Sequence, residues 1–162
     1  MYRDHGMSSD RRYWHEVLGY NYRMTNLQAA IGVAQMGKID RIIQLKKEIA
    51  KKYEKRLKNV PGITLPTNMD WAENVFWLYT ILVDQKVFGI SAERIIEKLK
   101  QSGIDTRPVF PPMHKQPLYQ NDQKLQVSEM ISLNGISLPS SPEITEDVIK
   151  RICDLILSTR EN

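Results

Sequence analysis

The sequence predicts an α+β fold in which a long helical segment precedes a small mixed domain. Three observations support this fold class. A helical pattern extends from Thr25 to about Asn59, the stretch Val75 to Val83 is rich in β-branched and aromatic residues, and two further helical patterns follow capping residues at Ser91 and Thr145. A chain of 162 residues with 41% hydrophobic residues is also long and apolar enough to bury a core.

Residues 1–24 are expected to be mostly loop, with one helical turn near Arg11 to Trp14. The long helix then begins at Thr25, because Thr25 and Gln28 have the spacing of a capping box, in which two side chains satisfy free backbone N–H groups. An apolar stripe follows this helix start: Leu27, Ala30, Ile31 and Ala34.

Two glycines interrupt the long helical pattern. We expect Gly32 and Gly37 either to bend this helix or to divide it in two, and Pro61 with Gly62 to end it. The rest of the chain predicts short strands and helices between turn residues. The predicted strands are 63–65, 75–83, 104–107 and 135–138, and the predicted helices are 92–101, 124–133 and 146–158. Four prolines between residues 108 and 117 predict a stiff, irregular stretch.

The net charge of +4 is concentrated in one segment of the long helix. Lys38 to Lys58 contains nine basic and three acidic residues. The same segment carries an apolar stripe, so we interpret its basic residues as the solvated face of an amphipathic helix. A nucleic-acid site would need aromatic residues among the exposed basic ones, and Tyr53 lies on the apolar stripe instead. We therefore expect no nucleic-acid partner.

Several other classes of function find no support in the sequence. No apolar run is long enough to span a membrane, residues 1–10 lack a signal-peptide pattern, and Cys153 has no second cysteine to pair with. We therefore expect a cytoplasmic protein without a membrane partner. The histidines His5, His15 and His114 lack the spacing of metal ligands on one helix, so no metal site is expected. Phosphate-binding glycine loops and serine-nucleophile motifs are also missing from the sequence.

Asn21 and Arg23 lie just before the capped helix start at Thr25. The N-terminus of a helix favours anions, because its free N–H groups and its dipole present positive charge. Asn21 and Arg23 are therefore candidates for holding a phosphate there. The alternative is a polar loop that only caps the helix.

Three residues farther along the chain are candidates for contact with a ligand. Arg107 precedes Pro108, which keeps its backbone extended, and its guanidinium suits a forked contact to phosphate. The alternative is a surface ion pair of Arg107 with Asp105 or another carboxylate. His114 lies in the proline-rich loop, either as a functional residue or as a surface histidine packed against prolines. Trp77 lies on a predicted strand, where it either packs in the core or stacks on a base or sugar.

Five segments resemble motifs of one protein family. Gly19 to Ala30 resembles the GxNxRMT-x-x-QAA signature of the DegT/DnrJ/StrS family of PLP-dependent sugar aminotransferases, most closely that of its perosamine-synthase-like members. The other four segments follow in family order: Arg3-Asp4-His5-Gly6, Val75–Tyr79, Thr106–Pro117 and Ile136–Pro142. Together they cover nearly the whole chain.

The resemblance implies a fold and a division of the chain. Residues 60–162 would form the small C-terminal α+β domain of a type I, aspartate aminotransferase-like, PLP-dependent transferase. Residues 1–24 would be the end of the large domain with an active-site loop, and residues 25–59 a long interdomain and dimer helix. The chain would thus correspond to the C-terminal portion of a family member.

The resemblance also implies an activity. The complete enzyme would move an amino group from glutamate to a nucleotide-linked keto sugar of the perosamine type, for polysaccharide precursor synthesis, with pyridoxal 5'-phosphate (PLP) as cofactor. It would be a homodimer with shared active sites, in which Asn21, helped by Arg23, reaches the PLP phosphate of the neighbouring subunit. Trp77, Arg107 and His114 would contact the substrate.

The Schiff-base lysine of the family, which follows a Ser-Phe pair, has no counterpart in this sequence. We therefore expect no catalytic residue within the chain, and we expect the chain alone to be inactive. The alternative hypothesis is a non-catalytic fragment or dimerising module. Such a module would expose apolar side chains near the N-terminus, with these candidates: Tyr2, Met7, Trp14 and Tyr20.

Overall fold

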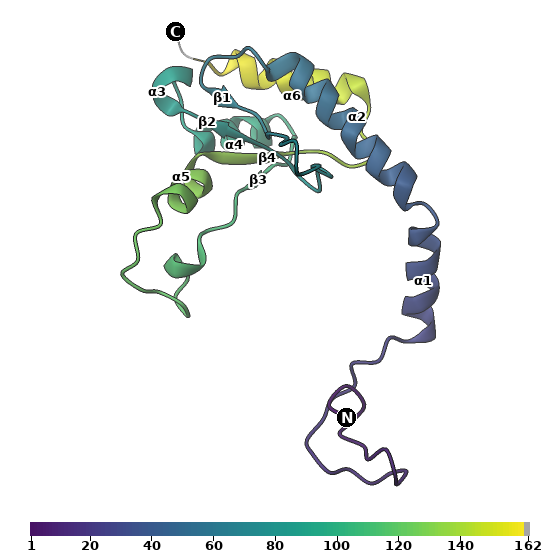
Figure 1. Ribbon diagram of the computed structural model, residues 1–162. Coiled ribbons are helices and arrows are strands. Elements are labelled where there is room, and N and C mark those ends of the chain that lie inside the picture. Colours follow the sequence, from purple (N-terminus) through teal and green to yellow (C-terminus); the bar gives the residue numbers. More distant parts are fainter. Residues whose placement is uncertain (161–162) are drawn as a thin grey trace. The chain divides into compact units, whose positions relative to one another are not determined.

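The computed structural model describes residues 1–160 and contains two compact units (Figure 1). The first unit, Met1–Asp40, consists of a looped segment followed by helix α1 (Asn26–Met36). The second unit begins at Arg41 and contains a four-stranded sheet with its helices. The mixture of helices with a small antiparallel sheet confirms the predicted α+β class.

Helix α1 begins with the predicted capping box. Thr25 Oγ1 accepts a hydrogen bond from Gln28 N–H at 3.3 Å, and Thr25 N–H donates to Gln28 Oε1 at 2.9 Å. The helix ends at Gly37, whose N–H donates to the Val33 carbonyl at 3.0 Å. Helix α2 (Ile39–Leu57) follows, so the long helical pattern is divided in two rather than bent.

The apolar side chains of the first unit remain exposed. None of the residues of α1 is buried, and Leu27 and Ile31 expose 80% and 65% of their surface. Tyr2, Trp14 and Tyr20 are also exposed, whereas Met7 is only half-buried. This unit therefore presents apolar surface that its own residues leave uncovered.

The sheet has the strand order β1-β2-β4-β3, and all its neighbours are antiparallel. The strands are β1 (Ile63–Thr64), β2 (Tyr79–Val83), β3 (Arg107–Pro108) and β4 (Gly135–Leu138). In the central pair, Tyr79 lies opposite Leu138 and Ile81 lies opposite Ile136. Because side chains alternate across a strand, these four apolar residues share one face of the sheet.

Three amphipathic helices supply the residues that pack with this apolar face. They are α2, α4 (Ala92–Gln101) and α6 (Glu146–Ser158). Helices α4 and α6 begin where predicted, because the side chains of Ser91 and Thr145 accept hydrogen bonds from Arg94 N–H and Val148 N–H. The core residues that these three helices contribute are Ile49, Ala50, Tyr53, Leu57, Ala92, Ile95, Leu99, Ile149, Ile152, Cys153 and Ile156.

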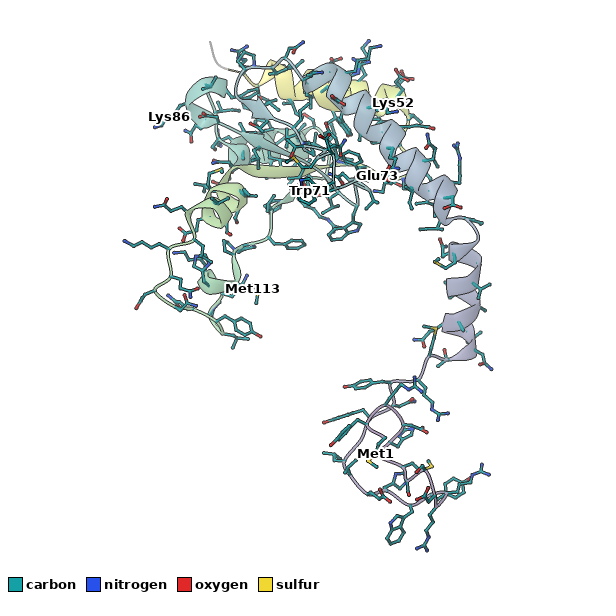
Figure 2. All side chains as sticks on the ribbon, in the orientation of Figure 1. Met1, Lys52, Trp71, Glu73, Lys86 and Met113 are labelled. Carbon is teal, nitrogen blue, oxygen red and sulfur yellow. The ribbon has the colours of Figure 1, made fainter. Side chains whose placement is uncertain are left out.

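The predicted strand 75–83 begins too early, because β2 begins only at Tyr79. Phe76 has φ +50°, and its N–H donates to Asn74 Oδ1 at 2.7 Å, so the chain turns there. Strand β4 ends opposite Tyr79 and leaves residues 75–78 without a partner. Trp77 is consequently 68% exposed, so its alternative interpretation as a core residue is wrong. Figure 2 shows Glu73, just before this turn, beside α2, where its carboxylate pairs with Lys47.

Other element boundaries differ from the sequence prediction in smaller ways. Strand β3 is shifted from 104–107 to Arg107–Pro108, because Ile104 N–H donates to the Leu99 carbonyl and completes the end of α4. Helix α5 (Gln126–Asn134) begins two residues later than predicted, and β1 is one residue shorter. Two short helices were not predicted: α3 (Gln85–Phe88) and the 3-10 helix η1 (Met113–Lys115).

Two stacked tyrosines join α2 to the sheet. The rings of Tyr53 and Tyr79 lie 4.8 Å apart between centroids, and the Tyr53 hydroxyl donates to the Pro139 carbonyl at 2.7 Å. We expect Tyr53→Phe to lower the free energy of unfolding by about 1–2 kcal/mol, because the Pro139 carbonyl loses its partner. Tyr79→Phe should change it by less than about 0.5 kcal/mol, since the Tyr79 hydroxyl has no hydrogen-bond partner within residues 1–160. Urea unfolding of both variants tests this, and equal losses would contradict it.

Candidate functional site

The two N-terminal motifs lie side by side within the first unit. Asp4 and Asn21 form an antiparallel bridge. Beside it, His5 N–H donates to the Tyr20 carbonyl at 3.0 Å, and Tyr20 N–H donates to the Tyr2 carbonyl at 2.8 Å. The segment Arg3-Asp4-His5-Gly6 is thus the backbone partner that holds Asn21 in place.

The glycines of these two motifs permit this close approach. A Cβ atom on Gly19 would lie 2.0 Å from the Gly6 nitrogen and 2.5 Å from the His5 carbonyl carbon. No side chain fits at that distance. Gly19 therefore lies where the two backbones touch, and a Cβ atom on Gly6 would lie 1.9 Å from the Val17 carbonyl oxygen.

Asn21 has a donor group available for a phosphate. Its Oδ1 accepts a hydrogen bond from Arg23 N–H at 3.3 Å, and its Nδ2 donates to no other residue in the part of the chain that the structure describes. The guanidinium of Arg23 instead forms an ion pair with the Asp4 carboxylate. Asn21 therefore keeps a donor free for an anion, whereas the guanidinium of Arg23 is already paired.

A row of polar side chains crosses the face of the sheet opposite the apolar core. Ser137 on β4 lies opposite Thr80 on β2 and opposite Arg107 on β3. Directly opposed residues in antiparallel strands point to the same side, so all three share this face. The hydroxyls of Thr80 and Ser137 lie 2.9 Å apart. The antiparallel register therefore places the candidate Arg107 at the end of a polar row.

An apolar cavity of about 360 Å³ lies over this row. The polar row contributes to its lining, together with Trp77, Val109 and Phe110. Phe110 is 73% exposed, so two large aromatic side chains border the cavity without being buried in the core. The structure thus brings the predicted residues Trp77 and Arg107 to one site.

A second, more polar cavity of about 290 Å³ shares Trp77, Leu78, Arg107 and Ser137 with the first. Its further lining consists of the apolar residues Leu138 and Pro139 and of five residues with charges or hydroxyls: Lys46, Asp105, Thr106, Ser140 and Ser141. Among residues 1–160, Arg107 forms no ion pair with Asp105 or with another carboxylate, which was the alternative interpretation. The two cavities adjoin, with Arg107 lining both.

Lys46 connects α2 to two irregular segments beside this cavity, one at Trp77 and one at Ser140. Its Nζ donates to the carbonyls of Trp77 at 2.9 Å and Ser140 at 2.6 Å. Desolvation by burial lowers the pKa of Lys46 from its ordinary value. Lys46 therefore fixes the backbone of Trp77 relative to the segment after β4.

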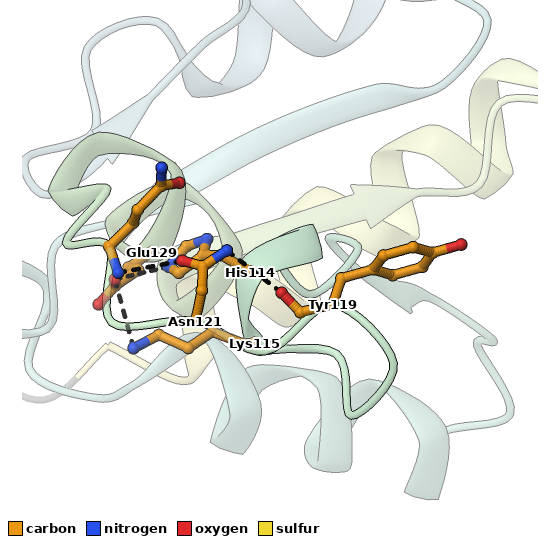
Figure 3. A network of polar contacts seen from close by, with 6 residues as sticks. His114, Lys115, Tyr119, Asn121 and Glu129 are labelled. Atoms are coloured by element: carbon orange, nitrogen blue, oxygen red, sulfur yellow. Dashed lines mark hydrogen bonds and ion pairs between the residues drawn. The ribbon is translucent and has the colours of Figure 1, made fainter.

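His114 does not line either cavity and belongs instead to a network of polar contacts with Glu129, Lys115 and Asn121 (Figure 3). His114 is 4% exposed, and its Nε2 lies 2.8 Å from Glu129 Oε1. The same Glu129 oxygen lies 3.4 Å from Lys115 Nζ. The hydrogen bond from His114, with the Lys115 charge, holds the pKa of Glu129 below its usual range. The buried His114 Nδ1 has no partner within residues 1–160. Asn121 N–H donates to the His114 carbonyl at 3.3 Å, which ties the loop together.

Sequence reasoning missed Lys46 and Glu129. Lys46 had a detectable signal, because it is four residues after Ile42 and four before Ala50, which places a lysine on the apolar stripe of α2. A charged residue at such a position has to reach polar partners. Glu129 had no comparable signal, since its partner His114 is fifteen residues away through an irregular loop.

Within residues 1–160, no group of three or more His, Cys, Asp or Glu side chains is arranged to hold a metal ion. Within the same range, no helix is both long and apolar enough to cross a membrane.

Comparisons with known proteins point to one family. The sequence model of the DegT/DnrJ/EryC1/StrS aminotransferase family matches residues 1–157. The GDP-perosamine synthases of Vibrio cholerae and Caulobacter vibrioides are 36% and 37% identical over 157 and 155 residues. These matches cover 95% and 93% of this chain but only 42% and 41% of the relatives. The chain therefore spans less than half the length of these relatives.

Solved structures agree with this result. Helicobacter pylori PseC, an aminotransferase involved in the biosynthesis of pseudoaminic acid, superposes with a TM-score of 0.85 at 27% identity. The match covers 98% of this chain and 44% of that protein. DesV of S. venezuelae gives the same TM-score at 26% identity, over 100% of this chain and 43% of its own.

Proposed function

The chain belongs to the DegT/DnrJ/EryC1/StrS aminotransferase family, and from this membership we propose that it forms the C-terminal part of a PLP-dependent sugar aminotransferase. The amino group would pass from glutamate to a nucleotide-linked keto sugar. The match over residues 1–157 carries this proposal. The similarity to GDP-perosamine synthases supports a GDP-linked sugar of the perosamine type.

PLP, when bound, would supply an electron sink for the carbon atoms between which the amino group moves. The residues of this chain would bind the cofactor and the sugar substrate and orient them. The exposed Nδ2 of Asn21 would donate to the PLP phosphate, and the Asp4–Asn21 bridge would hold that amide in position. Arg23 would act through its pairing with Asp4.

Trp77 and Arg107 would contact the nucleotide-linked sugar, because both line the adjoining cavities beside the sheet. The contact of His114 with substrate stays a prediction. Its burial and its bond to Glu129 support a role in fixing the proline-rich loop around the site. The division into 1–24, 25–59 and 60–162 also stays a prediction, as does the cytoplasmic location.

A homodimer with shared active sites remains part of the proposal. Apolar side chains of α1 and the N-terminal loop are exposed. In the complete assembly, another subunit or domain would cover this surface. The same exposure favours the second candidate function, a non-catalytic dimerising module. The mass of the native polypeptide in its source separates the two. A mass near 18.9 kDa would favour the module, and a longer chain with a Schiff-base lysine would favour the enzyme.

The role of Asn21 can be tested by cofactor retention in the native enzyme. We expect Asn21→Ala to weaken PLP binding by about 10- to 100-fold, the equivalent of one lost hydrogen bond to a charged group. The fold, measured by circular dichroism, should be unchanged because the Asn21 side chain is exposed. Asn26→Ala, five residues later on an equally exposed asparagine, is the matched control. PLP affinity that stays the same in Asn21→Ala would remove this role.

A further inference from the structure

We propose that Glu129 is a positioning residue for the apolar cavity beside the sheet. Through its bond to His114 it anchors the proline-rich loop to α5, and this anchor sets where the ring of Phe110 borders the cavity. The anchor itself is independent of the proposed function, whereas its effect on substrate binding rests on that function.

His114 is the point at which the proline-rich loop enters the interior of the domain. Between positions 107 and 128, all of which the structure describes, His114 is the one buried residue. Residues 110–124 bond to one another, as in the hydrogen bond from Asn121 N–H to the His114 carbonyl at 3.3 Å. In the described part of the chain, their hydrogen bonds and ion pairs to other segments all go to the Glu129 carboxylate (Figure 3). Glu129 is therefore the polar link between this loop and α5.

The chemistry of the pair explains why His114 stays buried. The hydrogen bond from His114 holds the pKa of Glu129 below its usual range, so Glu129 is a carboxylate and only accepts hydrogen bonds. The Nε2 atom of His114, 2.8 Å away, therefore carries the proton that it donates. Without Glu129 this buried N–H group would have no acceptor, which is unfavourable. The imidazole would then move out to water and take the loop with it.

Val109 provides a second contact between the loop and α5. A Cβ atom on Gly135, the residue directly after α5, would lie 2.3 Å from Val109 Cγ2 and 2.7 Å from the Ile131 carbonyl oxygen. Gly135 thus leaves the space that Val109 occupies. The loop is consequently attached near the end of α5 at Val109 and near its start at His114, which bonds to Glu129.

Phe110 lies between these two attachments. Two prolines follow it directly, and their rings restrict the backbone torsion φ. Phe110 is 73% exposed, so few contacts of its own hold the ring in place. Its position at the cavity therefore follows from the backbone, which is fixed on one side at Val109 and on the other at His114. Glu129 does not line the cavity and acts on it only through His114.

Hydrogen exchange of loop amides tests the anchor. In the full chain, we expect Glu129→Ala to accelerate exchange of the Gln116 and Asn121 amides by about 10-fold or more and to leave the Ile81 amide of β2 unchanged. Glu129→Gln should restore most of the protection, because its Oε1 is still an acceptor. Glu97→Ala removes an ion-paired glutamate from α4 and is the matched control, which should leave the loop amides unchanged.

Fluorine NMR tests the effect on the aromatic ring. The chain contains three phenylalanines, so labelling with para-fluorophenylalanine gives three resonances, and Phe110→Leu assigns the one of interest. We expect the Phe110 resonance to shift in Glu129→Ala and to return in Glu129→Gln. The resonance of Phe88, which is fully buried in the core, should stay in place. A general loss of stability would not single out Phe110.

Three results would overturn the inference. The first is loop amides that exchange as slowly in Glu129→Ala as in the unchanged chain. The second is a Phe110 resonance that does not move. The third is an equal effect of Glu129→Gln and Glu129→Ala, because the hydrogen bond to His114 would then not be the cause.

Kinetics of the native enzyme separate this inference from the proposed function. We expect Glu129→Ala to raise the KM for the sugar substrate about 10-fold and to leave kcat nearly unchanged, because a displaced ring weakens binding throughout the reaction. A shifted Phe110 resonance with an unchanged KM would overturn the positioning role and leave the proposed function. If the native enzyme transfers no amino group to a sugar, the proposed function fails, and the exchange and fluorine measurements still decide the anchor because they need no substrate.

Discussion

Replacing Gly19 with alanine is expected to separate the two N-terminal motifs. The added methyl group would lie 2.0 Å from the Gly6 nitrogen, and neither backbone can yield without breaking the bonds around Tyr20. We expect hydrogen exchange of the His5 and Tyr20 amides to accelerate by about 100-fold or more, which corresponds to about 3 kcal/mol of local stability. Because Asn21 would lose its position, PLP retention by the native enzyme should fall at least as far as in Asn21→Ala.

Gly32→Ala is the matched control for this substitution. Gly32 lies within α1, and a Cβ atom there would have no neighbour within 4 Å. Alanine should therefore stabilise the helix by up to about 1 kcal/mol and leave the exchange of the His5 and Tyr20 amides unchanged. Unchanged exchange in Gly19→Ala would show that the two motifs do not touch as described.

The second large effect is expected in the core of the sheet. Ile81 is fully buried on β2, on the face opposite the polar row. Ile81→Ala should lower the free energy of unfolding by about 3–4 kcal/mol, because it leaves a cavity between the sheet and its helices. Urea unfolding followed by circular dichroism measures this loss.

Ile131→Ala removes the same atoms from a residue of α5 that is 36% exposed. Ile131→Ala should lower the free energy of unfolding by less than about 1.5 kcal/mol, since water already reaches that side chain and alanine favours the helix. A similar loss in both variants would mean that β2 does not occupy the centre of the core.

The starts of the capped helices α1, α4 and α6 were predictable from local sequence, whereas the start of strand β2 was not. The caps at Thr25, Ser91 and Thr145 depend on residues three positions away, and all three are confirmed. Strand β2 depends on β4, more than fifty residues later, and β4 ends opposite Tyr79. Nothing within 75–83 could show that its first four residues have no partner strand.

The candidate site likewise combines residues that the sequence predicted with contacts that only the tertiary structure creates. Arg107 and Trp77 were predicted from their residue types and from a family resemblance, which the family match confirms. Their common cavity follows from the register that places Arg107 opposite Ser137. Lys46 lies beside Trp77 and Arg107 only because α2 packs on the sheet. This packing brings the Lys46 ammonium to the Trp77 carbonyl.

The sequence by itself determined the starts of the capped helices α1, α4 and α6, the glycines of the two N-terminal motifs and the family. These features depend on short-range hydrogen bonds and on motif spacing, which a linear sequence contains. The tertiary structure alone decided that Trp77 is exposed, that His114 is buried against Glu129, and which polar side chains share a cavity. The partner and burial of a side chain depend on antiparallel pairing and helix packing between distant segments, and that information is not local.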